Sequence, residues 1–226
     1  MSEPISPEAP GRSVLQGYQM LRETCGRVEL RHSRLIELAG EDAKGWLQGQ
    51  ITNDLRNFPL GATLGFCLCS ATGQLEAIGQ LWTVPGRVLV VMEENAAPVL
   101  LQRAEKMVVL EDVRARQLEC ELISVQGPEA THELARAIEL PLMDAAEVTV
   151  AGCSVACLRT NKSGFGGWTF VVSPEAAPAA DLLRTTYQEV DPEAYRIACL
   201  EAGTPAFGTD TNSKTLPPEL GQAFES

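Results

Sequence analysis

Strand-like segments follow one another in this chain without a helix-length segment between them, and this grouping constrains the fold most. Three of them lie in succession over Gly65 to Cys69, Gly73 to Val84 and Arg87 to Met92, and only turn residues separate them. Connections this short join antiparallel neighbours, because a parallel pair needs a crossover of a dozen or more residues. The segments therefore predict an antiparallel meander and disfavour a doubly wound parallel sheet.

A strand, turn and helix pattern occurs twice in the sequence. The first copy is a strand over 27–39 followed by the turn Gly40-Glu41-Asp42-Ala43 and a helix. The second runs from a strand over 122–125 through Gly127-Pro128-Glu129-Ala130 into a helix over 131–138. Acidic residues suit a helix N-terminus and proline suits its first turn, so this likeness has a local physical cause and need not mean duplication.

The remaining segments complete an α+β pattern. Amphipathic spacing predicts helices over 13–25, from a cap at Asn95 to about Val109, and over 176–187, and alternation predicts strands over 147–158 and 168–172. The fold class we predict is therefore α+β, with antiparallel sheets and helices packed against them.

Composition narrows the classes of partner and compartment. The chain of 226 residues is 45% hydrophobic and 21% charged, which is typical of a globular core. Its net charge of -12 would repel phosphate backbones, so we expect no nucleic acid partner. No apolar run reaches the roughly 18 residues of a membrane span, so we expect no membrane association. Residues 1–12 are rich in Pro, Glu and Ser and indicate a disordered tail.

The cysteines indicate a reduced protein without a metal site. There are seven, and no secretion signal accompanies them, so we expect a cytoplasmic location and no disulfide framework. Cys67 and Cys69 share one strand face, as do Cys153 and Cys157, but neither pair has a second pair at matching spacing. Buried packing is the interpretation that we favour for both pairs.

A polar corner around Gln50, Thr52, Asn53 and Asp54 is the most informative local feature. Carboxamides, a hydroxyl and a carboxylate together can read the donor and acceptor edge of a pterin-like ring. A hydrogen-bonded helix cap would explain Asn53 and Asp54 equally well. The spacing alone leaves both interpretations open.

Three stretches of sequence resemble a known family. They are Ile36 to Leu55 (IELAGEDAKGWLQGQITNDL), Gly73 to Gln80, and Tyr195 to Glu219 (YRIACLEAGTPAFGTDTNSKTLPPE). With the turn at 127–130, they resemble the folate-binding superfamily that contains the glycine-cleavage aminomethyltransferase, or T-protein, and the YgfZ-type proteins. This resemblance implies small α+β modules around a central channel that admits tetrahydrofolate.

The resemblance also implies which residues face the folate. The implied positions are Gln50, Thr52, Asn53, Asp54, Thr169, Arg196 and Glu201. Two departures bear on the activity. The transferases carry paired aspartates where this chain reads Gly73-Gln74-Leu75-Glu76-Ala77, and they carry a glutamate that grips the pterin where this chain has Thr169. These departures disfavour aminomethyl transfer and favour the YgfZ-type branch.

We therefore expect a tetrahydrofolate-binding accessory protein that supports assembly or repair of iron-sulfur proteins, with those proteins or their assembly factors as partners. The alternative is a tetrahydrofolate-dependent aminomethyltransferase or related one-carbon transferase, with Glu76 or Asp54 as acid or base. A third hypothesis is that the folate pocket is vestigial and the acidic surface docks a partner protein.

The resemblance further implies a division into modules. We expect a first folate-binding module over 13–112 together with 188–226, and a second α+β module over 113–187. The K-G-C-Y-x-G-Q loop of YgfZ-type proteins, which follows their L-P-x-E block, is not among the 226 residues. We expect a shortened chain without the C-terminal barrel module, and the alternative is a protein that has lost this loop.

Overall fold

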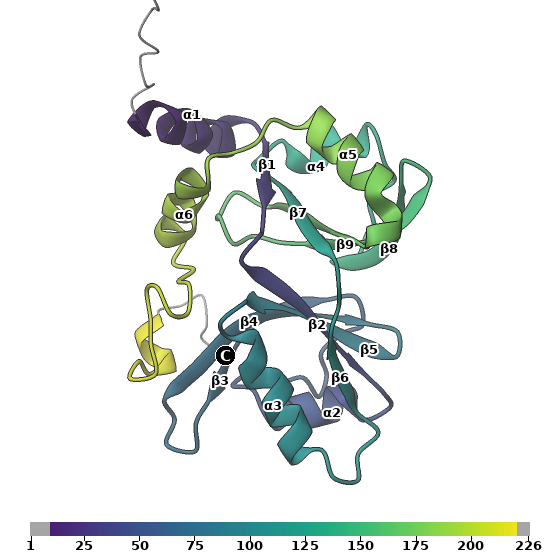
Figure 1. Cartoon of the computed structure of the whole chain (residues 1–226), viewed down its shortest axis with the longest axis vertical. Coiled ribbons are helices and arrows are strands. Elements are labelled where there is room, and N and C mark those ends of the chain that lie inside the picture. Colours follow the sequence, from purple (N-terminus) through teal and green to yellow (C-terminus); the bar gives the residue numbers. More distant parts are fainter. Residues whose placement is uncertain (1–9, 221–226) are drawn as a thin grey trace, which may run out of the picture.

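The computed structural model describes residues 10–220 and consists of two five-stranded sheets, one above the other in Figure 1. Neighbouring strands within each sheet are antiparallel, and helices cover the outer faces. The predicted α+β class is confirmed. Within the described residues, no helix combines the length and the apolar character needed to cross a membrane.

The lower sheet has the strand order β3-β4-β5-β2-β6. Its strands are β2 (Ser33–Ala39), β3 (Thr63–Cys69), β4 (Leu75–Val84), β5 (Arg87–Glu93) and β6 (Arg114–Gln117). Helices α2 (Ala43–Gln48) and α3 (Ala97–Met107) lie on one face and enclose a core around Phe66, Leu81 and Leu100. Consecutive pairing of β3, β4 and β5 confirms the predicted meander.

The upper sheet has the order β1-β7-β10-β9-β8. Its strands are β1 (Gly26–Glu29), β7 (Glu121–Gln126), β8 (Ala145–Val150), β9 (Cys153–Arg159) and β10 (Gly167–Val172). Helices α4 (Ala130–Ala135) and α5 (Ala177–Thr186), with the short 3-10 helix η1 (Pro174–Ala176), pack on its outer face around Trp168, Phe170 and Leu183.

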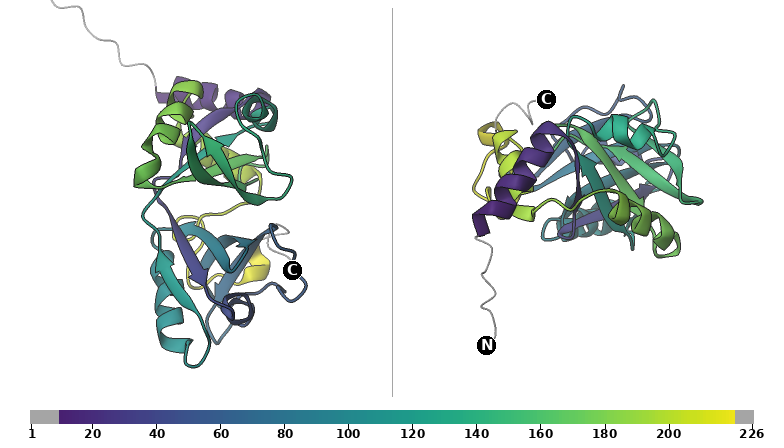
Figure 2. Two further views of the ribbon diagram at one scale, coloured as in Figure 1. Left: turned by 90° about the vertical axis from the view of Figure 1, so that its right-hand side faces the viewer. Right: turned by 90° about the horizontal axis from the view of Figure 1, so that it is seen from above.

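Two further helices lie beside the upper sheet. α1 (Pro10–Glu23) packs against α6 (Pro192–Glu201) through Leu21, Ala194 and Ala198. After α6 the chain descends beside the lower sheet, and its described part closes with the 3-10 helix η2 (Pro217–Leu220), as Figure 2 shows. There the amide of Leu75 donates to the carbonyl of Thr215 at 2.9 Å, which fixes this segment to the start of β4.

The predicted strand over 27–39 is two strands in different sheets. β1 pairs with β7 of the upper sheet, whereas β2 pairs with β5 and β6 of the lower sheet. The chain crosses between the sheets a second time from β6 to β7, beside the first crossing. Hydrogen bonds from Leu30 N to Leu122 O (3.0 Å) and from Leu118 N to Leu35 O (2.9 Å) join the two crossings. β1, which falls in the expected first module, therefore lies in the upper sheet with the strands of the expected second module. β6, which falls in the expected second module, lies in the lower sheet with the strands of the first.

Other boundaries differ for local reasons. Asn95 does not cap α3, because its side-chain amide donates to the carbonyl of Phe207 at 3.1 Å and the helix begins at Ala97. The predicted strand over 147–158 is the hairpin of β8 and β9, which turns at Ala151 (φ 51°) and Gly152 (φ 79°). Residues 10–12 belong to α1, and the rest of the expected disordered tail lies outside the described residues.

Candidate functional site

Two adjoining hollows lie where the lower sheet, the loop that connects β9 to β10, and helix α6 meet. The inner hollow has a volume of about 310 Å³ and the outer hollow about 490 Å³. Both are lined by Glu93, Lys162, Thr204 and Pro205, so they form one continuous space that we call the inter-sheet cleft. These volumes lie in the range of ligand pockets in proteins, roughly 300–1,000 Å³.

The inner hollow is lined by amides, glycines and apolar groups. Gly79 and Gln80 of β4 form its lower wall, and Asn161 and Gly164 of the β9–β10 loop form the upper wall. Gln80 Nε2 donates to Thr63 Oγ1 at 3.0 Å, and Asn161 Oδ1 accepts from the amide of Gly166 at 2.7 Å. These bonds fix both carboxamides and leave one acceptor oxygen and one donor amide for other partners.

The outer hollow is more charged and is bordered by α6. Arg196 donates to Asp210 at 3.0 Å on one side, and Arg31 and Glu189 lie on another. Tyr195 and Cys199 also border it. Such a mixture of charges suits a ligand that carries both polar donors and an anionic group.

Two of the titratable groups that α6 brings to the cleft, Tyr195 and Cys199, are neutral near pH 7. Burial raises the pKa of Tyr195 well above its usual range, and burial raises that of Cys199 to about 11. Because the thiolate is the nucleophile, the Cys199 thiol is poorly suited to covalent catalysis. The cleft is therefore better equipped for binding than for attack by this sulfur.

A row of buried polar side chains lies on the inner face of the upper sheet. Thr169 donates to the hydroxyl of Ser124 at 3.1 Å, and Gln126 Nε2 donates to the same hydroxyl at 3.0 Å and to Tyr195 at 3.4 Å. Within residues 10–220, Gln126 Oε1 has no hydrogen-bond partner. Thr169 is only 2% exposed and does not line either hollow.

The polar corner at residues 50–54 lies elsewhere, against β3. None of its members lines the inter-sheet cleft. Thr52 N donates to Cys67 O at 3.1 Å, Thr52 Oγ1 donates to Asn53 Oδ1 at 2.9 Å, and Asn53 is buried. These bonds tie the loop after α2 to the sheet.

Arg103 of α3 brings Glu76, another predicted site residue, close to this corner. Its guanidinium forms an ion pair with Glu76 and donates to the carbonyls of Cys69 at 2.9 Å and Gln50 at 3.4 Å. Cys67 and Cys69 lie in a small core with Leu75, and burial raises the pKa of Cys67 to about 12. Within residues 10–220, no three His, Cys, Asp or Glu side chains are grouped so as to hold a metal ion.

Asp54 and Glu201 are each engaged outside the cleft. Arg56 donates to both carboxylate oxygens of Asp54, at 3.0 and 2.7 Å, and holds its pKa at about 2. Asp54 is thus a permanent anion near neutral pH and cannot serve as a general acid. Glu201 accepts a hydrogen bond from Tyr18, which links α6 to α1. Of the residues that the resemblance implied, Arg196 is the one that lines a hollow.

Sequence reasoning missed the cleft residues Glu93 and Lys162. Glu93 ends the almost wholly apolar strand β5, and Lys162 lies in the glycine-containing loop before β10. A charged residue directly after an apolar strand, or in a loop between strands, is a usable signal for a site. The signal is weak in this sequence because Glu94 and Asn95 follow immediately.

Comparison with known proteins identifies the family. The family model described as GCVT N-terminal domain matches residues 8–225. The chain belongs to this family. An aminomethyltransferase from Thermotoga petrophila is 25% identical over 229 residues, which cover 94% of this GCVT domain chain and 62% of the relative. A tRNA-modifying protein YgfZ from Photobacterium profundum is 25% identical over 143 residues, which cover 63% of this chain and 41% of the relative.

A solved structure confirms the fold. The crystal structure of glycine cleavage system aminomethyltransferase T from Bartonella henselae matches with a TM-score of 0.80 and 22% identity, over 90% of this chain and 58% of that one. The T-protein-like architecture that the resemblance implied is therefore confirmed. This GCVT domain chain spans less than two thirds of the length of the relatives named here.

Proposed function

We propose that this chain binds a reduced folate in the inter-sheet cleft. The observation that carries this proposal is the cleft itself, in which a small amide-lined hollow opens into a larger charged one in a GCVT N-terminal domain. A folate has a flat ring with donors and acceptors along one edge and a flexible tail that ends in carboxylates. The ring suits the inner hollow and the tail suits the outer one.

The residues of the cleft fit this ligand chemically. Gln80 and Asn161 supply a carboxamide on each wall of the inner hollow, and Arg31 and Arg196 supply cationic groups at the outer hollow. Bound tetrahydrofolate would supply the acceptor of a one-carbon group. The protein's own part would be to hold the ring and to pair with the tail.

A titration with a blocked variant tests the proposal. Thr204 borders both hollows, so Thr204→Trp fills the junction, whereas Thr185→Trp places the same side chain on the exposed end of α5. We expect heat release with 5-formyltetrahydrofolate for the native protein and Thr185→Trp, and its loss for Thr204→Trp. Absence of native binding at millimolar ligand would remove the folate proposal. Equal binding by both variants would place the folate outside the cleft.

For the role of the bound folate, we propose the YgfZ-type function of an accessory protein for iron-sulfur proteins, whose partners would be those proteins or their assembly factors. Two findings support it. The carboxylate of Glu76 is engaged by Arg103, and Thr169 is buried in a hydrogen-bonded row, so neither offers a carboxylate to the cleft.

Aminomethyl transfer is the alternative, and the curated relatives support it at least as well, since an aminomethyltransferase matches 94% of the chain. An assay of methylenetetrahydrofolate formation from an aminomethyl donor distinguishes the two. Turnover would establish the transferase. Folate binding without turnover, together with copurification of iron-sulfur cluster proteins, supports the accessory function.

A further inference from the structure

Glu93 and Lys162 are two opposite charges that border both hollows of the cleft. Glu93 stands at the end of β5 in the lower sheet, and Lys162 stands in the β9–β10 loop above it. Both side chains are half-buried. Within residues 10–220, no ion pair or side-chain hydrogen bond involves either of them, so they lie in one space without pairing with each other.

This lack of partners sets them apart from the charges around them. The neighbouring carboxylate, Glu94, contacts His32 at 3.1 Å and forms an ion pair with Arg34. Across the cleft, Arg196 and Asp210 pair at 3.0 Å. A half-buried charge without a partner is unfavourable, because it has lost part of its hydration and gained no counter-charge. A ligand that brings a donor edge and an anionic group would satisfy both charges at once.

Their surroundings point them at the same region. Glu93 and Lys162 border the outer hollow together with Tyr195 and Cys199. Tyr195 and Cys199 lie on successive turns of α6 at the rim of the outer hollow. The two charges therefore converge where the inner hollow opens into the outer one.

We propose that Glu93 and Lys162 determine the ligand specificity of the cleft. The Glu93 carboxylate accepts hydrogen bonds from the N–H donors of the heterocycle, and the Lys162 ammonium binds the carboxylate of the tail. This inference rests on the proposed folate binding.

Two matched pairs of variants test the assignment by calorimetry. Glu93→Gln has the adjacent control Glu94→Gln, whose carboxylate pairs with Arg34 and lines neither hollow, and Lys162→Met has the exposed control Lys214→Met. The ligands are 5-formyltetrahydrofolate, which carries an anionic tail, and tetrahydrobiopterin, which has the same donor edge and no anionic group. Thermal unfolding of every variant is measured in parallel.

Glu93→Gln should weaken binding of both ligands by about tenfold or more, which is typical of losing a hydrogen bond to a charged group. Lys162→Met should weaken the folate alone, and the controls should bind as the native protein does. Unfolding temperatures of Glu93→Gln and Lys162→Met should be unchanged or higher, whereas a structural role would lower them.

The contrary outcomes are distinct. Native affinity of Glu93→Gln for the folate would overturn the role of Glu93 and leave the proposed function intact. Equal loss of both ligands in Lys162→Met would overturn the assignment of Lys162 to the tail. Failure of the native protein to bind the folate would remove the proposed function and this inference with it.

Discussion

Gly40 and Gly127 occupy the same place in the two halves of the molecule. Each follows a strand, begins the turn into a short helix and has a positive φ, of 124° and 131°. A Cβ at Gly40 would lie 1.9 Å from the carbonyl oxygen of Asp112, and one at Gly127 would lie 2.3 Å from that of Thr24. Only glycine allows this approach, which lets another segment of the chain join each turn.

Gly127→Ala should therefore be far more costly than an ordinary glycine substitution. It combines an unfavourable backbone conformation with a clash against backbone, and we expect a loss of about 3 kcal/mol in the free energy of unfolding. Gly73→Ala is the control, because Gly73 also has a positive φ (80°) but open space around it, and it should lose about 1 kcal/mol. Urea unfolding measures both, and equal losses would refute the close-approach explanation.

Glu37 should make stability depend on pH. Its side chain is 5% exposed, and although burial raises its pKa, hydrogen bonds from Arg87 and Arg116 outweigh this and lower it below the usual value. A lowered folded-state pKa stabilises the protein above the unfolded value of about 4.3, and this contribution is lost as the pH falls through the folded value.

Glu37→Gln should accordingly cost about 2 kcal/mol of unfolding free energy at pH 7, as expected for charged hydrogen bonds. The difference from the native protein should shrink as the pH falls below about 4.3. Urea unfolding between pH 7 and pH 3 measures it, with the exposed Glu105→Gln as control. A difference that is constant across this range would show that the carboxylate charge is not responsible.

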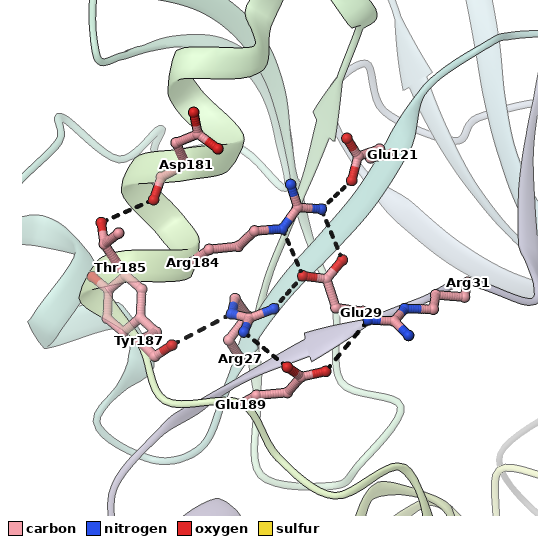
Figure 3. A network of polar contacts seen from close by, with 9 residues as sticks. All are labelled: Arg27, Glu29, Arg31, Glu121, Asp181, Arg184, Thr185, Tyr187 and Glu189. Carbon is pink, nitrogen blue, oxygen red and sulfur yellow. Dashed lines mark hydrogen bonds and ion pairs between the residues drawn. The ribbon is translucent and has the colours of Figure 1, made fainter.

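At the scale of elements, a network of ion pairs joins α5 to β1 and β7 (Figure 3). Glu29, only 8% exposed, lies between Arg27 and Arg184, and Arg184 also pairs with Glu121. Arg27 in turn contacts Glu189 at 3.1 Å. Burial raises the pKa of Glu29, but the hydrogen bonds and charge of Arg184, with Arg27 and Arg31, lower it overall. The network fixes the chain after α5 against the edge strand of the upper sheet.

Arg184→Met should loosen this attachment. It removes one of the two arginine partners of the buried Glu29, which keeps Arg27. Because of that remaining partner, and because Arg184 itself is 35% exposed, we expect a loss of about 2 kcal/mol of unfolding free energy. Arg136→Met removes an exposed arginine that pairs with Glu133 and should cost about 0.5 kcal/mol. Denaturant unfolding measures both losses. Similar losses would show that the network stabilises the protein no more than an exposed ion pair does.

The elements also show how far the sequence predicts the fold. The meander of β3, β4 and β5 was predictable because glycine-containing turns mark each reversal. The change of sheet within 27–39 was not predicted, although the polar run Arg31-His32-Ser33-Arg34 interrupts the apolar pattern there, because pairing partners are chosen by distant residues. β6 escaped prediction since its sequence, Arg114–Gln117, is short and polar.

The candidate site was predicted less well than the fold, for a physical reason. Sequence shows which polar residues cluster along the chain, and residues 50–54 do so, but Thr52 bonds to Cys67 of β3 and to Asn53, and none of these residues lines the cleft. The cleft instead gathers Glu93, Lys162 and Arg196 from three separated segments. Such convergence depends on packing between the halves, which leaves no local pattern.

At the scale of the whole molecule, the two sheets share a core. Leu35, Trp82 and Leu89 of the lower sheet pack against Leu122 and Leu158 of the upper sheet. Trp82 Nε1 also donates to the carbonyl of Arg159 at 3.0 Å across this contact. The halves should therefore unfold together as one cooperative unit.

The three tryptophans allow a direct test. Trp46 lies in the lower core and Trp168 in the upper core. Trp46→Phe retains the upper-core Trp168, Trp168→Phe retains the lower-core Trp46, and both variants retain Trp82. In each variant, the urea midpoint measured by tryptophan fluorescence should equal the midpoint measured by circular dichroism. Fluorescence and dichroism midpoints that separate would indicate independent halves.

The passages of the chain between the halves have a further consequence. Two of them, at 30–32 and 118–120, run side by side, and the third follows α6 through 203–206. Residues from the first and third passages both border the outer hollow. A ligand there would therefore lie between two of the connections that join the halves. Because both connections are covalent, they limit how far the halves could separate to release it.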